Sequence, residues 1–229
     1  MDFEQQRVQI CEVCQKMWQL GWVAANDGNV TMKLEDGTFL ATPTGISKSM
    51  MSPEMLIQID AQGNVLSALH GYKPSSEIKM HLCCYRQRED VGAVVHAHPP
   101  AATGFAVAGK SLDGYNMIET VISMGSVPLT PYGTPSTDEV PQAITPYLEH
   151  HDVLLLQNHG ALTLGQDLLT AYYRMESLEL WAKISINAHL LGGEKELKRE
   201  NIETLLHLRD TYYHVSGRHP GYKKYPEGV

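Results

Sequence analysis

Two short histidine motifs, each at the end of a buried-strand pattern, constrain the fold and the site more than any other feature. His96-Ala97-His98 follows the apolar run 91–95, and Asn158-His159-Gly160 follows the leucine-rich run 153–156. Continuous apolar runs of this length are typical of buried strands. Because side chains alternate along a strand, the sequence predicts that the first two histidines point to the same face.

A same-face histidine pair, joined by a third histidine from a neighbouring strand end, is a geometry that suits a divalent metal. Three histidines that leave one position open are typical of a catalytic zinc site. The alternative is that these are ordinary polar residues at strand ends, because eleven histidines in 229 residues are not exceptional. The pattern alone leaves both interpretations open.

The composition predicts one globular domain over residues 1–229, with 43% hydrophobic and 19% charged residues. No run of 18 apolar residues predicts a membrane span. The N-terminus is acidic and lacks the apolar core of a signal peptide, so we expect a cytoplasmic protein. The net charge of −8 argues against a nucleic-acid partner. An anionic substrate therefore needs local positive features, such as a metal or backbone N–H groups.

The cysteines permit a redox or zinc interpretation, because Cys11 and Cys14 form a C-x-x-C motif. However, Cys14 lies at helical spacing from Ile10 and Met17, which indicates a small core residue. We therefore expect free thiols, as in a reducing cytosol.

Hydrophobic periodicity and turn residues predict helices and strands along the whole chain. Helices are expected over 3–20, 74–88, 100–108, 137–150, 167–191 and 199–214, and strands near 28–31, 38–42, 55–60, 91–98, 153–156 and 161–164. Ser75 is the expected N-cap of the second helix. Helices before, between and after short strands indicate an α/β layered protein with a largely antiparallel sheet.

Three further segments lie at expected strand or helix ends. Ser75-Ser76-Glu77 offers free N–H groups and two hydroxyls to an oxyanion, and Glu77 is placed to act as a base or a metal ligand. Gly28-Asn29 and Thr42-Pro43-Thr44-Gly45 have little bulk and let a ligand approach the backbone. The alternatives are a plain helix cap and two turns.

In their order and approximate spacing, these segments and the two histidine motifs resemble the class II aldolase/adducin family, in particular its fuculose-phosphate aldolases. The resemblance extends from the first helix to about Tyr213. It implies a three-layer α/β/α fold around a mainly antiparallel sheet. It also implies a homotetramer of four-fold symmetry with active sites between subunits.

The resemblance assigns roles to individual residues. It implies that His96, His98 and His159 bind Zn²⁺ or another divalent metal, with Glu77 as a fourth ligand at rest and the acid/base in turnover. It implies that Tyr212 reaches a neighbouring subunit's site. The residues implied to bind the substrate and its phosphate are Gly28, Asn29, Thr44, Gly45, Ser75 and Ser76.

The chain departs from the fuculose-phosphate aldolases at one catalytic position. Those enzymes have a tyrosine before a Met-Ile pair, whereas here Asn116 precedes Met117 and Tyr115 lies one residue earlier. In a strand, this offset would point Tyr115 to the opposite face. Tyr212 therefore becomes the leading candidate for proton transfer to the aldehyde oxygen.

The resemblance implies a zinc-dependent aldolase that cleaves a ketose 1-phosphate, such as fuculose 1-phosphate or a related deoxy-ketose 1-phosphate. The products would be dihydroxyacetone phosphate and a small aldehyde. A pentulose-phosphate 4-epimerase and a methylthioribulose-phosphate dehydratase are alternatives on the same fold. A non-catalytic module like adducin is the third, although adducin lacks the metal histidines that this chain retains.

Overall fold

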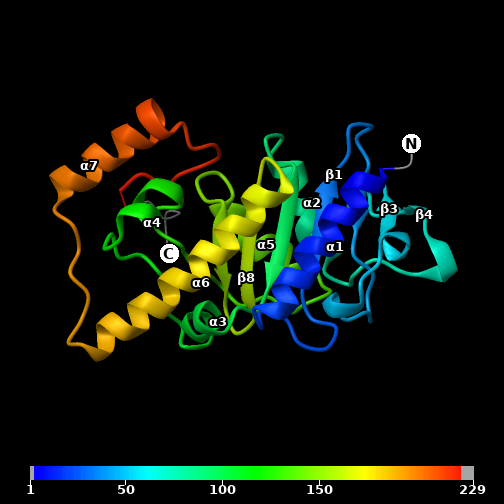
Figure 1. Cartoon of the computed structure of the whole chain (residues 1–229), viewed down its shortest axis with the longest axis horizontal. Helices are drawn as coiled ribbons and strands as arrows, with labels where there is room; N and C mark the ends of the chain where they lie inside the picture. Colours follow the sequence, from blue (N-terminus) through cyan, green and yellow to red (C-terminus); the bar gives the residue numbers. More distant parts are fainter. Residues whose placement is uncertain (1–2, 223–229) are drawn as a thin grey trace.

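The computed structural model describes residues 3–222, which form an α/β fold with a central mixed sheet between helices (Figure 1). The sheet has eight strands in the order β4-β3-β2-β1-β5-β8-β7-β6. Every pairing is antiparallel except that of β6 with β7. The strands are β1 Asn29–Lys33, β2 Phe39–Ala41, β3 Ile57–Ile59, β4 Val65–Ser67, β5 Ala93–Ala97, β6 Leu129–Thr130, β7 Val153–Leu156 and β8 Gly160–Gly165.

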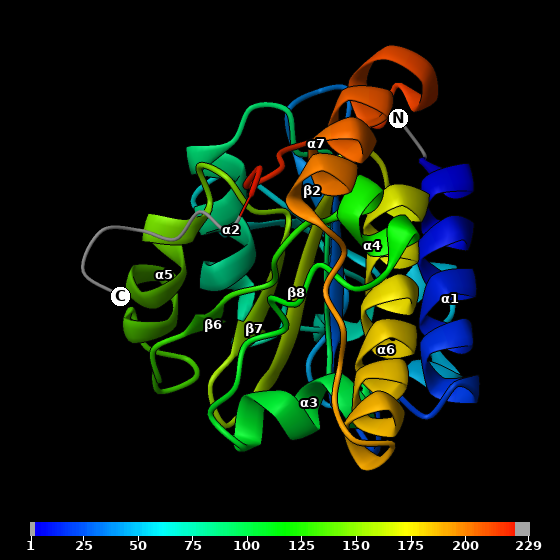
Figure 2. The same cartoon turned by 90° about the vertical axis from the view of Figure 1, so that its left-hand side faces the viewer.

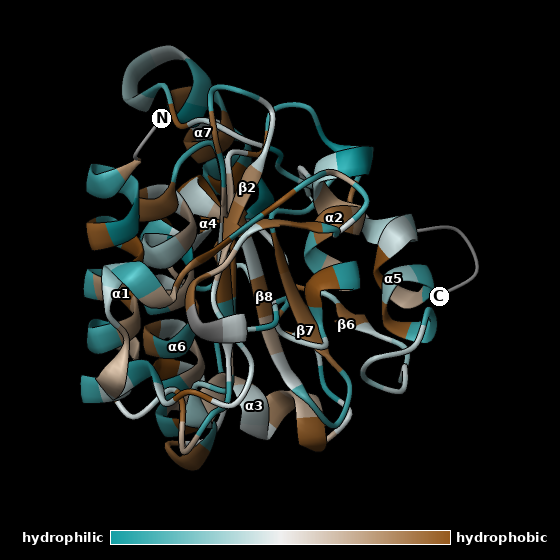
Figure 3. Cartoon of the chain, turned by 90° about the vertical axis from the view of Figure 1, so that its right-hand side faces the viewer, coloured by the Kyte–Doolittle hydropathy of each residue, from teal (hydrophilic) through white to brown (hydrophobic). Residues whose placement is uncertain are grey.

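Helices cover both faces of this sheet, which gives the expected three layers (Figure 2). One layer holds α1 (Glu4–Gln19), α3 (Pro100–Val107) and α6 (Leu168–Leu190), and the other holds α2 (Ile78–Gln87) and α5 (Glu139–Ile144). The short α4 (Ile118–Ser123) and the C-terminal α7 (Arg199–Leu208) pack against each other beside α6. The hydrophobic strands lie between the two layers (Figure 3).

Alternation along β5 divides its side chains between the two cores. Ala93 and Val95 belong to the core under α1, α3 and α6, whereas Val94 belongs to the core under α2 and α5. His96 continues the Val94 series and therefore faces α2. The central strand thus presents its metal-binding candidate to the layer that carries Glu77.

The two longest helices follow the sequence expectation closely. α6 begins at Leu168, and the Asp167 side chain accepts a hydrogen bond from the Thr170 backbone N–H at 2.7 Å. Aspartate is a preferred N-cap residue, and the predicted helix 167–191 starts at this position. Cys14 of α1 is fully buried and all four cysteines are free thiols, as predicted.

The predicted start of the second helix is wrong. α2 begins at Ile78, and Ser75 does not cap it; the Ser75 hydroxyl instead accepts from the Glu77 N–H at 3.3 Å. The chain stays extended through Pro74 because that residue bridges Pro43, and the Ser75 N–H donates to the Thr42 carbonyl. The helix predicted over 137–150 is also shorter, because α5 ends at Ile144 and a 3₁₀ turn follows.

Within residues 3–222, none of the helices is both long and apolar enough to cross a lipid bilayer.

Candidate metal and substrate site

The three predicted histidines lie together. His96 is on β5, His98 follows β5 directly, and His159 lies in the tight connection between β7 and β8. Their ligand nitrogens are all within 4.8 Å of one another. The pairing of β5 with β8 therefore joins two motifs that are sixty residues apart in the sequence.

Backbone geometry explains the Asn-His-Gly motif. Asn158 has a φ of 56°, in the left-handed region that asparagine tolerates better than most residues. A Cβ atom on Gly160 would lie 2.5 Å from Cδ2 of His98 and 2.6 Å from the Ala97 carbonyl oxygen. Only glycine therefore lets β8 approach β5 closely enough to bring His159 beside the other two rings.

The environment of His96 determines which ring nitrogen is free. Its Nδ1 lies 2.9 Å from the Ala161 carbonyl oxygen, which can only accept, so Nδ1 carries the proton. Burial lowers the pKa of His96 to about 3, so the ring is neutral near pH 7 and its Nε2 carries a lone pair. This Nε2 faces Nε2 of His98 at 3.2 Å.

Glu77 faces the histidines from the start of α2. Its Oε1 lies 3.0 Å from Nε2 of His159, and its Oε2 lies 3.3 Å from Nε2 of His96. Burial by itself raises the pKa of Glu77, but His96, His159 and a hydrogen bond from Asn29 outweigh it. The pKa of this carboxyl therefore lies below its ordinary value, and the group is an anion at neutral pH.

This donor set fits a divalent metal. The imidazole nitrogens and the carboxylate are the ligand types that zinc prefers. Glu77 Oε1 is buried and lies 3.0 Å from His159 Nε2, but it accepts no well-aligned hydrogen bond among the residues that the structure describes. A buried charged oxygen without a hydrogen bond is costly, and a cation among the histidines would remove that cost.

Part of the predicted phosphate site lies directly beside Glu77. Asn29 Nδ2 donates to Ser75 Oγ at 3.2 Å and to Glu77 Oε2 at 2.8 Å. Thr44 and Gly45 are exposed on the neighbouring loop, and the Thr44 N–H already donates to the Lys73 carbonyl at 2.9 Å.

The remaining predicted substrate residues differ in exposure. Ser76 is exposed. Gly28 is buried with a φ of +71°, and a Cβ there would lie 2.6 Å from Val23 Cγ1 and 3.0 Å from the His96 carbonyl oxygen. Its geometry therefore serves the close approach of β1 to β5.

Residues 113–117 form no strand, so alternation along a strand does not decide where Tyr115 points. The Tyr115 ring is buried against Val121 and Ile202, and its hydroxyl donates to the Gly221 carbonyl. Asn116 accepts from Trp181 Nε1 at 2.9 Å and donates to Glu194. The contacts of Tyr115 therefore lead to α4, α7 and the C-terminal segment, and those of Asn116 lead to α6 and the segment after it.

Tyr212 lies in a π-helical turn, Arg209–Tyr213, that continues α7, and it is 72% exposed. In Figures 1 and 2, α7 lies toward the end of the molecule opposite α3, the helix that begins just after His98. The predicted approach of Tyr212 to a neighbouring subunit's site therefore stays a prediction. The sequence has further tyrosines after Tyr212, and one of them, Tyr225, lies outside the described residues.

Three residues that the sequence analysis did not select lie close to the site. Asp27 Oδ2 is 3.6 Å from His98 Nδ1, which is the ring nitrogen that does not face His96. Lys48 is buried, and its Nζ donates to the Asn26 and Ile46 carbonyls, which joins two loops of the site. His81 is fully buried behind Asn29. His81 lies four residues after Glu77, and that spacing is the one sequence signal for it.

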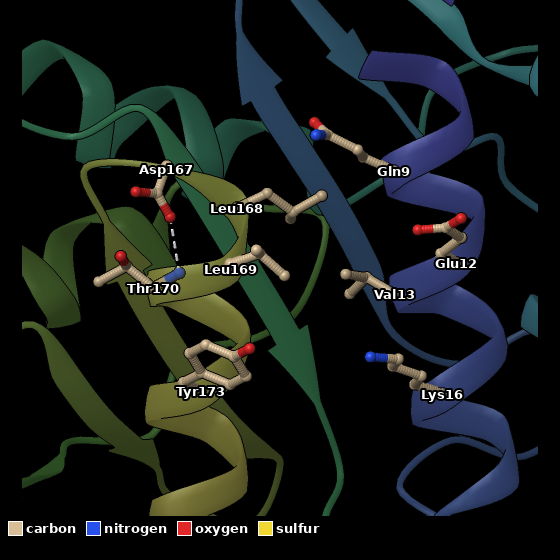
Figure 4. Close-up of a pocket in the computed structure, with 9 residues that line it drawn as sticks. All are labelled: Gln9, Glu12, Val13, Lys16, Asp167, Leu168, Leu169, Thr170 and Tyr173. Carbon is tan, nitrogen blue, oxygen red and sulfur yellow. Dashed lines mark hydrogen bonds between the residues drawn. The ribbon is translucent and has the colours of Figure 1, made fainter. Parts of the chain in front are cut away.

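A separate cavity of about 410 Å³ lies between α1 and α6 (Figure 4). Its wall includes Glu12, Lys16, Asp167 and Tyr173. None of the predicted site residues lines it, so the site is identified by its chemistry and not by cavity size.

Comparison with known proteins agrees with this geometry. The class II aldolase and adducin N-terminal domain family matches residues 8–186. The 3-oxo-tetronate 4-phosphate decarboxylase of Escherichia coli is 34% identical over 183 residues, which are 78% of this chain and 84% of the relative. The L-fuculose phosphate aldolase of Methanocaldococcus jannaschii is 32% identical over 181 residues, which are 78% of this chain and 94% of that relative.

Solved structures show the same similarity. Escherichia coli YgbL, described with the alternatives aldolase, epimerase and decarboxylase, has a TM-score of 0.80 and 31% identity over 89% of this chain and 98% of its own. An L-fuculose 1-phosphate aldolase has a TM-score of 0.81 and 27% identity, and the match covers 88% of this chain and 94% of its own. The fold and site thus define a class II aldolase-type protein, and the chain belongs to the class II aldolase and adducin family.

Proposed function

We propose that the chain is a zinc-dependent lyase that breaks the bond between the α and β carbons of a sugar phosphate that carries a carbonyl group. The first candidate is an aldolase that cleaves a ketose 1-phosphate, such as fuculose 1-phosphate or a related deoxy-ketose 1-phosphate. The observation that carries this proposal is Glu77, an anionic carboxylate 3.0 Å from His159 and hydrogen-bonded to Asn29.

A divalent ion bound by His96, His98 and His159 would polarise the substrate carbonyl as the bond breaks. Three histidines with an open position favour Zn²⁺ as this ion. The chain's own residues then have two tasks: to hold the phosphate and to move the proton.

Glu77 is placed for the proton step. In cleavage of a ketose 1-phosphate, the C4 hydroxyl would pass its proton to a base, for which Tyr212 of a neighbouring subunit is the candidate. The C3–C4 bond then breaks and C3 retains the electron pair. Glu77 would deliver a proton to C3, which releases dihydroxyacetone phosphate and an aldehyde. Asn29, Ser75, Ser76 and the Thr44–Gly45 loop would hold the phosphate beside it.

A decarboxylase is the second candidate, and two observations favour it. The Escherichia coli 3-oxo-tetronate 4-phosphate decarboxylase is 34% identical to this chain. Asn116 also stands where the fuculose-phosphate aldolases have a tyrosine, and loss of CO₂ from a 3-oxo acid forms no aldehyde oxygen that needs such a group. Decarboxylation of that 4-phosphate leaves the same enediolate of dihydroxyacetone phosphate, so Glu77 would perform the same protonation.

The assembly proposed for this function is a homotetramer with active sites between subunits. Exposed apolar side chains on α6 support a subunit contact, because Leu169, Tyr173, Leu180 and Ile184 recur at intervals of four and seven residues. Light scattering after size exclusion would measure the mass, and a monomer would contradict this assembly.

Product analysis tests the reaction. The purified protein with Zn²⁺ should be incubated separately with ketose 1-phosphates, including 5-deoxypentulose 1-phosphates, and with 3-oxo-tetronate 4-phosphate. Dihydroxyacetone phosphate with an aldehyde supports the aldolase, and the same phosphate with CO₂ supports the decarboxylase. An isomeric pentulose phosphate or a dehydrated phosphate would replace both with an epimerase or a dehydratase.

A further inference from the structure

A buried chain of hydrogen bonds extends behind Glu77. Asn29 Nδ2 lies 2.8 Å from Glu77 Oε2, and Asn29 Oδ1 lies 2.5 Å from His81 Nε2. His81 Nδ1 lies 2.8 Å from Thr31 Oγ1, which in turn lies 2.8 Å from the Tyr85 hydroxyl. Four polar side chains therefore connect the carboxylate to the interior of the protein.

Two regular elements align this chain. Asn29 and Thr31 are two residues apart on β1 and therefore point to the same face. Glu77, His81 and Tyr85 are four residues apart at the start of α2 and along it, so they lie on one helix face. The row of hydrogen bonds thus forms where one face of β1 packs against one face of α2.

The carboxylate determines the direction of every hydrogen bond. An ionised carboxylate only accepts, so Asn29 must present its NH₂ group to Glu77 and its carbonyl oxygen to His81. His81 Nε2 must then donate, which leaves Nδ1 as an acceptor for the Thr31 hydroxyl. The Thr31 oxygen in turn accepts from the Tyr85 hydroxyl. Burial lowers the pKa of His81 to about 4, so the ring is neutral and has only one N–H to donate.

We propose that His81 is a positioning residue: its Nε2–H fixes the Asn29 amide so that the NH₂ group points at Glu77 and holds this carboxylate toward the histidines. The proposal rests on the proposed function, in which Glu77 moves the proton. Without the His81 donor, the Asn29 amide could turn over and present its oxygen to the carboxylate, which would repel it.

This row of hydrogen bonds holds the Glu77 carboxylate in place but transfers no proton to it. Its last member is an amide, which donates a hydrogen bond without transferring the proton to the carboxylate. His81 therefore acts through Asn29 on the orientation of Glu77, in the manner of the outer residues that orient metal ligands.

The first test observes the unaltered protein and uses a variant only to assign the signal. Protein with ¹⁵N-labelled histidine, stripped of metal with a chelator, should show the His81 ring in the neutral Nε2–H form by imidazole ¹⁵N NMR. The signal is assigned by its disappearance in His81→Gln. An Nδ1–H tautomer or a doubly protonated ring at pH 7 would overturn the proposal.

The second test compares two substitutions. His81→Phe keeps the ring shape but has no donor, whereas His81→Gln retains a donor near the Nε2 position. We expect His81→Phe to lower Zn²⁺ affinity by roughly 10- to 100-fold, as for other residues that orient metal ligands. Its kcat should fall by roughly 10- to 100-fold, the effect of losing one hydrogen bond to a charged group. His81→Gln should retain both quantities within about 3-fold, because the donor remains.

Met80→Ala is the matched control. Met80 is a buried neighbour on α2 that packs in the hydrophobic core, so this variant loses stability but keeps the hydrogen-bond chain. Equal losses of Zn²⁺ affinity in Met80→Ala and His81→Phe would assign His81 a packing role and overturn the proposal. If His81→Phe does not fold, a ten-fold loss of both quantities in His81→Gln overturns it equally. Failure of the proposed function would give a different result. Turnover would then be unchanged in Glu77→Gln, while His81 would still show the neutral Nε2–H form.

Discussion

Nε2 of His96 lies 3.2 Å from Nε2 of His98, and His96 Nδ1 is committed to the Ala161 carbonyl. The His96 lone pair is therefore directed toward the neighbouring ring. Such a pair of nitrogens favours a cation between the rings.

The first prediction concerns this cation. His98→Ala should lose most of the bound divalent metal, because the remaining ligands no longer enclose the ion. Metal analysis of the purified variant measures this loss. His207→Ala, on the exposed side of α7, is the control and should keep the metal. Full occupancy in His98→Ala would refute the assignment.

The second prediction concerns Glu77. Glu77→Gln keeps the shape of the side chain but removes its charge and its ability to exchange a proton. We expect kcat to fall by roughly 10²- to 10⁴-fold, the usual contribution of a general acid/base. Glu149→Gln, a substitution of an exposed side chain, should leave kcat unchanged. Steady-state kinetics on the substrate found by product analysis measures both, and near-normal turnover in Glu77→Gln would exclude the role.

The third prediction concerns the phosphate. Catalytic efficiency should be much higher for a ketose 1-phosphate than for the same ketose without phosphate. Ser76→Ala should raise KM for the phosphorylated substrate by roughly 10- to 100-fold, the effect of losing one hydrogen bond to an anion. Ser123→Ala on α4 serves as the control. Equal efficiency on the two substrates would show that no phosphate site exists here.

The fourth prediction concerns the tail. Truncation before Tyr212 would also remove Ser216 and Gly217, whose carbonyls accept from Arg174 and Arg209, so it would disturb the fold. Tyr212→Phe is the cleaner change. If Tyr212 transfers a proton in a neighbouring subunit, this variant should lose aldol cleavage and keep its metal. Tyr213→Phe should retain activity, and an active Tyr212→Phe would remove the tyrosine from the mechanism.

The fifth prediction concerns stability. Asp152 is buried and pairs with Arg88 at 2.7 Å and with Arg174 at 2.9 Å. Asp152→Asn leaves both guanidinium groups with less compensation, so the free energy of unfolding should fall by roughly 3–5 kcal/mol. Asp138→Asn breaks only an exposed pair with Lys79 and should cost under about 1 kcal/mol. Urea denaturation compares them, and similar midpoints would contradict the buried network.

The histidine cluster could be predicted from the sequence because it depends on local rules. Strand alternation places His96 and His98 together, and Asn158 with Gly160 marks a tight turn that delivers His159. Contacts between residues that are distant in the sequence could not be predicted. Nothing near His81 in the sequence shows that β1 lies against α2.

The errors have the same physical origin. Ser75 fits the helix-cap pattern, but the bridge between Pro43 and Pro74 delays the helix. A strand around Asn116 would point Tyr115 to the opposite face, but the segment forms no strand and its conformation follows its contacts with Trp181 and the C-terminal region. Both depend on residues that are distant in the sequence.

Asn29 and His96 are directly paired residues on β1 and β5. The separation between a group held by Asn29 and one held at His96 is therefore set by the sheet and not by a loop. With the phosphate on the Ser75 hydroxyl beside Asn29 and the carbonyl at His96, the sheet sets the distance between these two groups of the substrate. Substrates with an additional carbon between them would be excluded, whereas the part beyond the broken bond would be free to vary.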